Sequence, residues 1–215
     1  MPDGSMGMWV EISTPYVPMD LVKPKEAHQY WIKDPNNINP RVHYSQIFWA
    51  FDIRKHPESG VTQYCLKQGL GSLEDIYWVD AAVCSPIMPE DIKPIHSDAK
   101  DKRIAIRIRT RGLSTLSCYE GDEEVYFTTV STGRVNEETG KSATPIGNHT
   151  PWRKLISMHY SADNEFNDFD IPAVGWNFGI EPNGVFIHST YWHNAFGNMN
   201  SAGCINCRPE DAKWI

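Results

Sequence analysis

The sequence predicts a mainly β protein, and two features support this fold class. Apolar runs are short and are interrupted along the 215 residues by 15 glycines and 15 prolines, so long helical periodicity is scarce. In the stretch from Lys102 to Arg111, charged side chains also alternate with isoleucines. Alternation with a period of two is typical of a half-buried strand, and we favour that interpretation over a basic patch for nucleic acid.

Five segments are rich in β-branched and aromatic residues and are expected to form strands. In chain order they are Tyr44 to Asp52, Ile76 to Val83, Ile104 to Ile108, Val125 to Val130 and Val185 to His188. Turn-forming residues such as Glu120-Gly121-Asp122 separate them. The best helix candidate is the last segment, because Pro209 suits the first turn of a helix that continues to Trp214.

A proline-rich stretch from Pro86 to Pro94 divides the chain. Three prolines in nine residues favour an extended linker, and we therefore place a domain boundary near residue 95. Residues 1–95 are expected to form a small β-barrel-like domain, and residues 96–215 a second domain. Hydrophobic residues make up 40% of the chain, which supplies enough apolar surface for folded cores.

Charge and hydropathy argue against two classes of function. The formal net charge of −7 disfavours sequence-independent nucleic-acid binding, which needs clustered Lys and Arg. No run of 18 apolar residues occurs, so we expect no transmembrane helix. The start, Met1 to Met6, lacks a basic region followed by an apolar stretch, so no signal peptide is recognisable there and an exported location cannot be read from it. The five cysteines are an odd number, so at least one thiol is free or pairs with another chain.

The most informative stretch places a histidine and a cysteine near each other in sequence. His188 follows the apolar residues 185–187, and the small, turn-prone tetrad 201–204 ends in Cys204. A thiol acylates only as the thiolate, so it needs a neighbouring base such as imidazole. Gly203 permits a sharp turn, and the amides around it could face a developing oxyanion. The alternative is a buried structural cysteine.

The segment from Gly184 to Asp211 resembles the active-site region of the L,D-transpeptidase (YkuD-type) family. The family pattern is a histidine in an apolar strand, then a Ser/Thr-His-Gly-Cys tetrad with Asn or Arg two residues after the cysteine. Upstream, three further motifs follow in the family's order, so the resemblance covers roughly residues 100–215. These motifs are Tyr119-Glu120-Gly121, Ser131-Thr132-Gly133 and Thr144-Pro145-Ile146-Gly147.

This resemblance implies a β-sandwich catalytic domain that acts on peptidoglycan stem peptides in the cell envelope. Cys204 would be the nucleophile and His188 the general base, with the Ser189 carbonyl orienting the imidazole and Gly203 with its neighbours supplying oxyanion donors. The residues implied to contact substrate are Asn206, Ala202, Trp176, Tyr191 and Gly184. Carbapenems are the implied inhibitors, and neither a metal nor an organic cofactor is implied.

The chain departs from the family pattern at two places. Ala202 replaces the histidine of the tetrad, and the sequence ends at Ile215, where family members continue with a further strand. We therefore expect a catalytic domain that lacks its last sheet element and leaves an unpaired edge. Two alternatives stay open: an L,D-carboxypeptidase that uses water as the acceptor, and a non-catalytic wall-binding protein.

Other residues allow competing interpretations. His193 could replace His188 as the base, although a loop histidine is favoured. Cys204 and Cys207 form a Cys-x-x-Cys pair, which could be redox active or bind zinc, and a disulfide between them would block the nucleophile. The acidic run from Asp163 to Asp170 is expected to be a solvated loop or a flap.

The first domain resembles, through Tyr77-Trp78-Val79, the bacterial Src-homology-type β-barrels found beside cell-wall enzymes. That resemblance implies a wall-binding or positioning role. A structural cap on the catalytic domain is the alternative.

Overall fold

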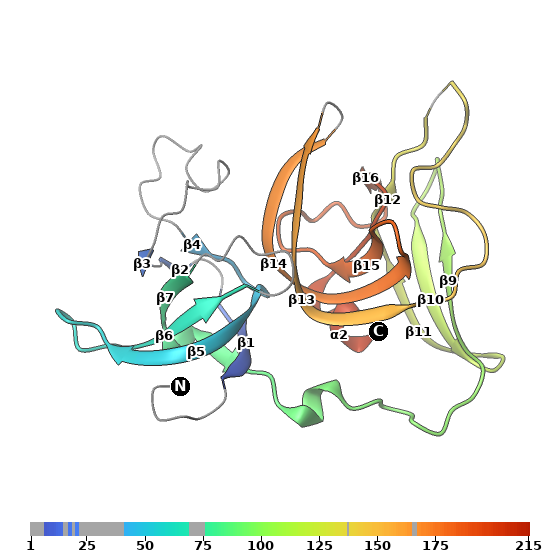
Figure 1. The fold of residues 1–215 in the computed structure, drawn as a ribbon. Helices are drawn as coiled ribbons and strands as arrows, with labels where there is room; N and C mark the ends of the chain where they lie inside the picture. The colour runs from blue at the N-terminus through green and yellow to red at the C-terminus, as the bar shows by residue number, and fades with distance from the viewer. Residues whose placement is uncertain are drawn as a thin grey trace. The chain divides into compact units, whose positions relative to one another are not determined.

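The structure is a computed structural model that describes residues 7–14, 17–18, 20–21, 41–68, 76–136, 138–164 and 167–215. It is mainly β, as the sequence predicts (Figure 1). The chain divides into two compact units. One comprises Met1–Ile92 with Ile156–Gly175, and the other comprises Lys93–Leu155 with Trp176–Ile215.

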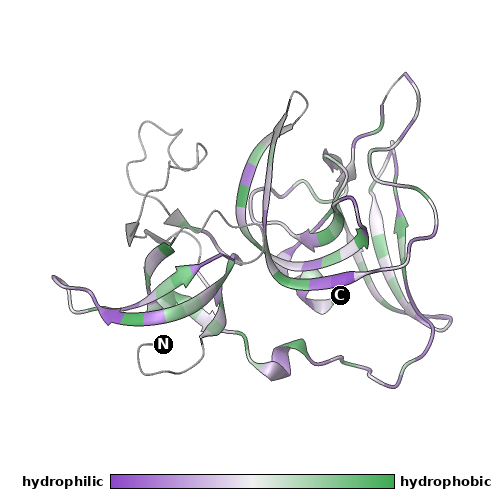
Figure 2. Ribbon diagram, viewed as in Figure 1, coloured by the Kyte–Doolittle hydropathy of each residue, from purple (hydrophilic) through white to green (hydrophobic). Residues whose placement is uncertain are grey.

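The first unit is built on a six-stranded sheet. The strand order is β3 (Asp20–Leu21), β7 (Ile76–Asp80), β6 (Thr62–Lys67), β5 (Ile47–Lys55), β1 (Met8–Ile12) and β8 (Cys84–Pro86). Two short strands, β2 (Val17–Pro18) and β4 (Arg41–Val42), pair separately. Along the strands, hydrophobic and hydrophilic residues follow one another in bands (Figure 2), as expected for strands with one buried face. The core of this unit includes Val10, Ile12, Phe48, Leu66 and Val79.

Two sequence predictions in this unit are wrong in detail. Strand β7 ends at Asp80 rather than Val83, because the Asp80 carboxylate accepts the Ala82 N–H (2.8 Å) and caps the 3-10 turn η1 (Ala81–Val83). The proline-rich stretch is also not extended throughout. A second 3-10 turn, η2 (Pro89–Ile92), occupies its middle, where the Met88 N–H donates to the Asp91 carboxylate (2.8 Å).

The rest of the described chain forms a three-stranded sheet, a four-stranded sheet, a two-stranded pair and a C-terminal helix. The three-stranded sheet has the order β11 (Glu123–Thr129), β10 (Thr115–Glu120), β9 (Lys102–Arg107). The four-stranded sheet has the order β13 (Arg153–Asn164), β14 (Asn167–Glu181), β15 (Val185–Ser189), β17 (Ile205–Cys207). A parallel pair, β12 (Thr132–Gly133) and β16 (Met199–Ser201), completes the strands described. Side chains from both sheets share one core, which includes Leu116, Cys118, Ile187 and Ile205, and this is the arrangement of the predicted β-sandwich.

The helix α2 (Pro209–Trp214) begins at Pro209, as predicted, and is fixed to strand β11 by a buried carboxylate. Asp211 accepts hydrogen bonds from the Tyr126 hydroxyl (2.6 Å) and the Thr128 hydroxyl (2.7 Å). The Trp214 ring stacks on Tyr126 with a centroid distance of 4.1 Å. The helix is short, so these contacts rather than its own backbone bonds hold it in place.

The hairpin of β13 and β14 is the main element that sequence reasoning missed. Residues 163–170 were expected to form a loop, but the strands continue through Asn164 and resume at Asn167. Its outer part, residues 156–175, belongs to the first unit. There the buried Gln46 side chain donates to the Pro172 carbonyl (2.9 Å), and the Ala173 N–H donates to the buried Gln68 side chain (3.1 Å).

Within the described ranges, no helix is both long enough and apolar enough to cross a membrane.

Candidate active site

The site is built on two neighbouring parallel strands, β15 and β17. Their register pairs Ile187 with Ile205 and His188 with Asn206. Because side chains alternate between the two faces of a strand, Ile187 and Ile205 point into the core, while His188 and Asn206 share the opposite face. Cys204 directly precedes β17 and lies two residues before Asn206, which pairs with His188 across the two strands.

The His188 imidazole is held in one tautomer. Its side chain is buried, and Nδ1–H donates to the Ser189 carbonyl oxygen (2.8 Å). This bond places the proton of the neutral ring on Nδ1, so the lone pair is on Nε2. Burial lowers the His188 pKa to about 4, a shift that the Ser189 hydrogen bond opposes and the neighbouring His193 reinforces. The ring is therefore neutral at physiological pH and able to accept a proton.

Cys204 is half-buried and carries a protonated thiol at neutral pH. Burial raises its pKa above the usual value, and a hydrogen bond from the Phe186 backbone amide only partly offsets this effect. The thiol points to the Gly184 carbonyl, with a sulfur–oxygen distance of 3.6 Å. Gly184 occupies the left-handed region (φ 102°) in the turn before β15, which favours glycine there. The resting pair is thus a neutral thiol and a neutral imidazole.

The loop that carries Cys204 is clamped by two hydroxyl groups. The Ser201 hydroxyl donates to the Cys204 carbonyl (2.5 Å) and accepts the Gly203 N–H (3.2 Å). From the other side, the Thr144 hydroxyl donates to the Gly203 carbonyl (2.8 Å). Gly203 is buried, and a Cβ at this position would lie 3.2 Å from the Ala143 carbonyl oxygen. The close approach of this backbone and the φ of 156° at Gly203 both favour glycine here.

His193 contacts Asn206, the residue that pairs with His188 across the two strands. Its Nδ1 accepts the Ala195 N–H (3.1 Å), and its Nε2 lies 3.0 Å from the side-chain amide of Asn206. Asn206 is buried, and its backbone pairs with Ser131 (2.8 and 2.9 Å). His193 therefore orients Asn206, as a polar neighbour of the site.

Aromatic rings border the histidine. Trp192 stacks on His188 with a centroid distance of 5.8 Å and an interplanar angle of 27°. Tyr191 meets Trp192 edge to face (5.1 Å), and Trp192 is 38% exposed. On the same face, Trp152 packs near Phe186 (6.3 Å). These rings can shield the imidazole from water and give an extended peptide a flat apolar surface.

The structure does not bring every predicted residue to the site. Trp176 packs with the core on the face opposite His188, with the Lys213 ammonium 5.3 Å from its ring centre. Its backbone has φ 54°, which is unusual for a residue other than glycine. Ala202 is exposed in the loop of residues 201–204, which carries Cys204. Tyr191 does not stack on His188 itself but contacts Trp192, which does.

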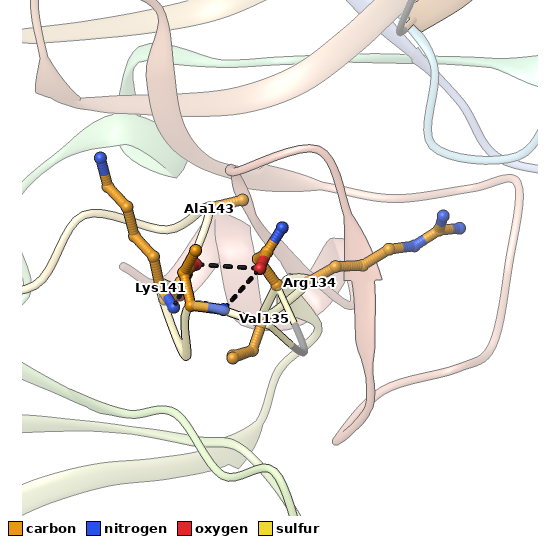
Figure 3. A pocket seen from close by; sticks show the side chains of 7 residues that line it. Arg134, Val135, Lys141 and Ala143 are labelled. Atoms are coloured by element: carbon orange, nitrogen blue, oxygen red, sulfur yellow. Dashed lines mark hydrogen bonds between the residues drawn. The ribbon is translucent and has the colours of Figure 1, made fainter.

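A hollow of about 470 Å³ is lined in part by Ala143, whose carbonyl oxygen approaches Gly203 in the loop that carries Cys204 (Figure 3). It is lined by a small hairpin in which Val135 bridges to Ser142 and the Asn136 side chain accepts the Thr139 N–H (2.8 Å). Arg134 and Lys141 line it too, and their charged ends extend in different directions (Figure 3).

Cys207 is more deeply buried than Cys204. It is fully buried in the core, and burial together with the Asp211 carboxylate raises its pKa far above the usual value. Three residues apart on an extended strand, the two Cα atoms are separated by roughly 10 Å, beyond the roughly 7 Å limit for a disulfide. The predicted alternative of a Cys204–Cys207 disulfide therefore does not fit. In the described ranges, no group of three or more His, Cys, Asp or Glu side chains is arranged to hold a metal ion.

Sequence reasoning missed three residues of the site: Trp192, Ser201 as a clamp, and Thr144. Trp192 carried a detectable signal, since it stands in an aromatic cluster directly after the histidine strand. Ser201 and Thr144 were noted only as parts of motifs. Their hydrogen bonds to the Gly203 and Cys204 backbones depend on a contact between distant segments, which no local pattern reveals.

The fold and site together define a β-sandwich domain with a buried histidine on one of two parallel strands and a cysteine directly before the other. The chain belongs to the family of YkuD-type L,D-transpeptidase catalytic domains, which matches residues 101–215. Among solved structures, the chain is similar to an L,D-transpeptidase from Mycobacterium smegmatis. The identity is 16%, the match covers 78% of this chain and 83% of that one, and the TM-score is 0.38. No curated protein matches the sequence.

Proposed function

We propose that this protein is a peptidoglycan L,D-transpeptidase that forms a thioester on Cys204. The observation that carries the proposal is the His188 imidazole, which the Ser189 carbonyl fixes with its proton on Nδ1, on the strand that pairs with β17 directly after Cys204. Membership of the L,D-transpeptidase family indicates the substrate, a peptidoglycan stem peptide, and a location outside the cytoplasm.

The reaction begins with a neutral thiol and a neutral imidazole, because burial raises the Cys204 pKa and lowers the His188 pKa. The thiol turns from the Gly184 carbonyl toward His188, and Nε2 takes its proton as sulfur attacks the peptide carbonyl. The tetrahedral intermediate then collapses. Its carbon–nitrogen bond breaks, the imidazolium returns the proton to the leaving D-amino acid amine, and the stem remains as a thioester on Cys204.

An amine from a second stem resolves the thioester. The amine nitrogen attacks the thioester carbonyl, the carbon–sulfur bond breaks, and the proton lost by the amine passes through His188 to the thiolate. The product is a new peptide cross-link. If water attacks instead, the same groups give an L,D-carboxypeptidase, so the acceptor alone separates these two activities.

The first test is the intact mass of the protein after incubation with a carbapenem, beside a Cys204→Ala control. The thiolate opens the β-lactam by breaking its carbon–nitrogen bond, and the nitrogen takes up the proton, so the adduct adds the whole mass of the drug. We expect one adduct on the wild type and none on the control. A folded, reduced wild type that acquires no adduct contradicts the proposal and favours a non-catalytic wall-binding protein.

The second test separates the acceptors. The protein is incubated with a synthetic tetrapeptide stem, alone and with an amine acceptor, and the products are weighed by mass spectrometry. A cross-linked product supports the transpeptidase. A shortened stem without any cross-link, even with excess amine, contradicts transfer and identifies the carboxypeptidase.

A further inference from the structure

We propose that Thr144 is a positioning residue that aims the Cys204 backbone amide at the oxyanion of the acylation step. Thr144 is 2% exposed and lies against the nucleophile loop, 60 positions before Cys204 in the sequence. The inference rests on the proposed function, since an oxyanion forms only if Cys204 attacks a carbonyl.

The Thr144 hydroxyl joins two backbones. It accepts the Gly133 N–H of strand β12 (2.7 Å) and donates to the Gly203 carbonyl (2.8 Å). The packing here is close, because a Cβ on Gly133 would lie 2.6 Å from the Thr144 amide nitrogen. A hydroxyl has one proton, so accepting from Gly133 leaves that proton for Gly203. The direction of the Gly203 carbonyl is thereby set.

The same bond sets the direction of the next amide. No peptide bond in the described chain is cis, and in a trans peptide the carbonyl and the following N–H point in opposite directions. With the Gly203 carbonyl directed at Thr144, the Cys204 N–H points away from Thr144. Within the described part of the chain, this N–H donates to no protein acceptor.

The neighbouring amide is already engaged. The Gly203 N–H donates to the Ser201 hydroxyl (3.2 Å), so of these two adjacent amides the Cys204 N–H is the one that can bind a developing negative charge. This sharpens the sequence-based expectation, in which Gly203 and its neighbours shared that role. A donor fixed before the reaction needs no reorganisation in the transition state, which is why its orientation matters.

The test compares two reactions of the same thiol. Acylation by a carbapenem forms an oxyanion, whereas alkylation by iodoacetamide forms none and reports only the reactivity of the sulfur. Both second-order rates are measured by mass spectrometry at Cys204 for the wild type, Thr144→Val and Thr144→Ser. Valine keeps the shape without the hydroxyl, and serine keeps the hydroxyl. Thr139→Val, an exposed threonine of the same hairpin, is the matched control.

We expect Thr144→Val to slow acylation by about 10- to 100-fold, less than the 10²–10³ expected for complete removal of a donor, because the amide is misdirected rather than lost. Alkylation should stay within about twofold, since the thiol environment is unchanged. Thr144→Ser should restore acylation, and Thr139→Val should match the wild type.

Two outcomes overturn the inference: equal loss of both rates in Thr144→Val, which indicates a generally disordered loop, or acylation at the wild-type rate. A failure of the proposed function looks different. The wild type itself would then be alkylated but not acylated, and the role of Thr144 would fall with it.

Discussion

The two faces of strands β15 and β17 differ sharply although they share the same backbone. One face carries His188 and Asn206, with Cys204 just before the strand, and the other carries Ile187, Ile205 and Cys207. Two cysteines three residues apart therefore have opposite environments. Cys204 is half-buried beside a polar cluster, and Cys207 is fully buried in the core. Strand alternation accounts for the buried position of Cys207 on the core face.

The largest expected effect tests this separation directly. Cys204→Ala should abolish carbapenem acylation, a loss on the order of 10⁴-fold or more, because no other group can form the thioester. Cys207→Ala should acylate at close to the wild-type rate and lose about 1 kcal/mol of stability, because a small cavity replaces a buried sulfur. Acylation rates and urea unfolding of both variants are the measurements. Loss of acylation in Cys207→Ala would break the comparison.

A second pair of variants compares the two histidines. His188→Gln should slow acylation by about 10²- to 10⁴-fold, because it removes the base. His193→Asn should have a smaller effect of about tenfold or less, because it acts through the orientation of Asn206. The acylation rates of the two variants at pH 7 show which histidine contributes more to the reaction. A larger loss in His193→Asn would make His193 the base.

The depressed pKa of His188 predicts how stability depends on pH. The folded state holds this ring neutral down to about pH 4, whereas the unfolded chain protonates it near the ordinary value of 6.5. Its contribution is complete above pH 6.5 and is lost as the pH falls to about 4, a change of about 3 kcal/mol. Urea unfolding between pH 4 and 7.5 should show this loss in the wild type. His188→Gln should lack that component, and parallel pH profiles would contradict the prediction.

The smallest expected effect on acylation comes from Asp211, whose carboxylate holds helix α2 against strand β11. Asp211→Asn keeps the shape of the side chain but turns one acceptor into a donor facing the hydroxyls of Tyr126 and Thr128. We expect a loss of about 1–2 kcal/mol in the free energy of unfolding. Acylation should be little changed, because helix α2 lies on the core side of the sheet. Thermal unfolding measures the stability of this variant, and a parallel assay measures its acylation rate. A slower acylation without a loss of stability would contradict the prediction, because it would show that Asp211 on the core face affects the site.

Features encoded locally were predictable from the sequence. Strand β15 follows from its apolar run, and helix α2 follows from Pro209. The pairing of the His188 strand with the strand that follows Cys204 could only be expected from the family resemblance. Alternation assigns faces within a strand but does not say which strands are neighbours.

Features that depend on distant partners were not predictable. The hairpin strands contain Pro172 and several acidic or amide residues, which individually disfavour strands, and pairing overrides those preferences. Trp176 was expected at the substrate site from the family resemblance. The positive φ angles of Ala173 and Trp176 disturb simple alternation along β14, and the ring lies in the core. The Thr144 clamp likewise needs segments about 60 residues apart to meet.

The first unit is discontinuous in sequence, and this has a consequence for its synthesis. Its core needs Ile156–Gly175, where Val174 is fully buried and Gly175 leaves no room for a Cβ beside Ile47. During translation, Gln46 and Gln68 emerge about 100 residues before the backbone groups of Pro172 and Ala173 that they bind. The first 92 residues therefore cannot finish folding as they leave the ribosome. Residues 93–155, which are more than half of the second unit, are synthesised before the first unit has its whole core. The two units therefore complete their folding at a similar stage of synthesis.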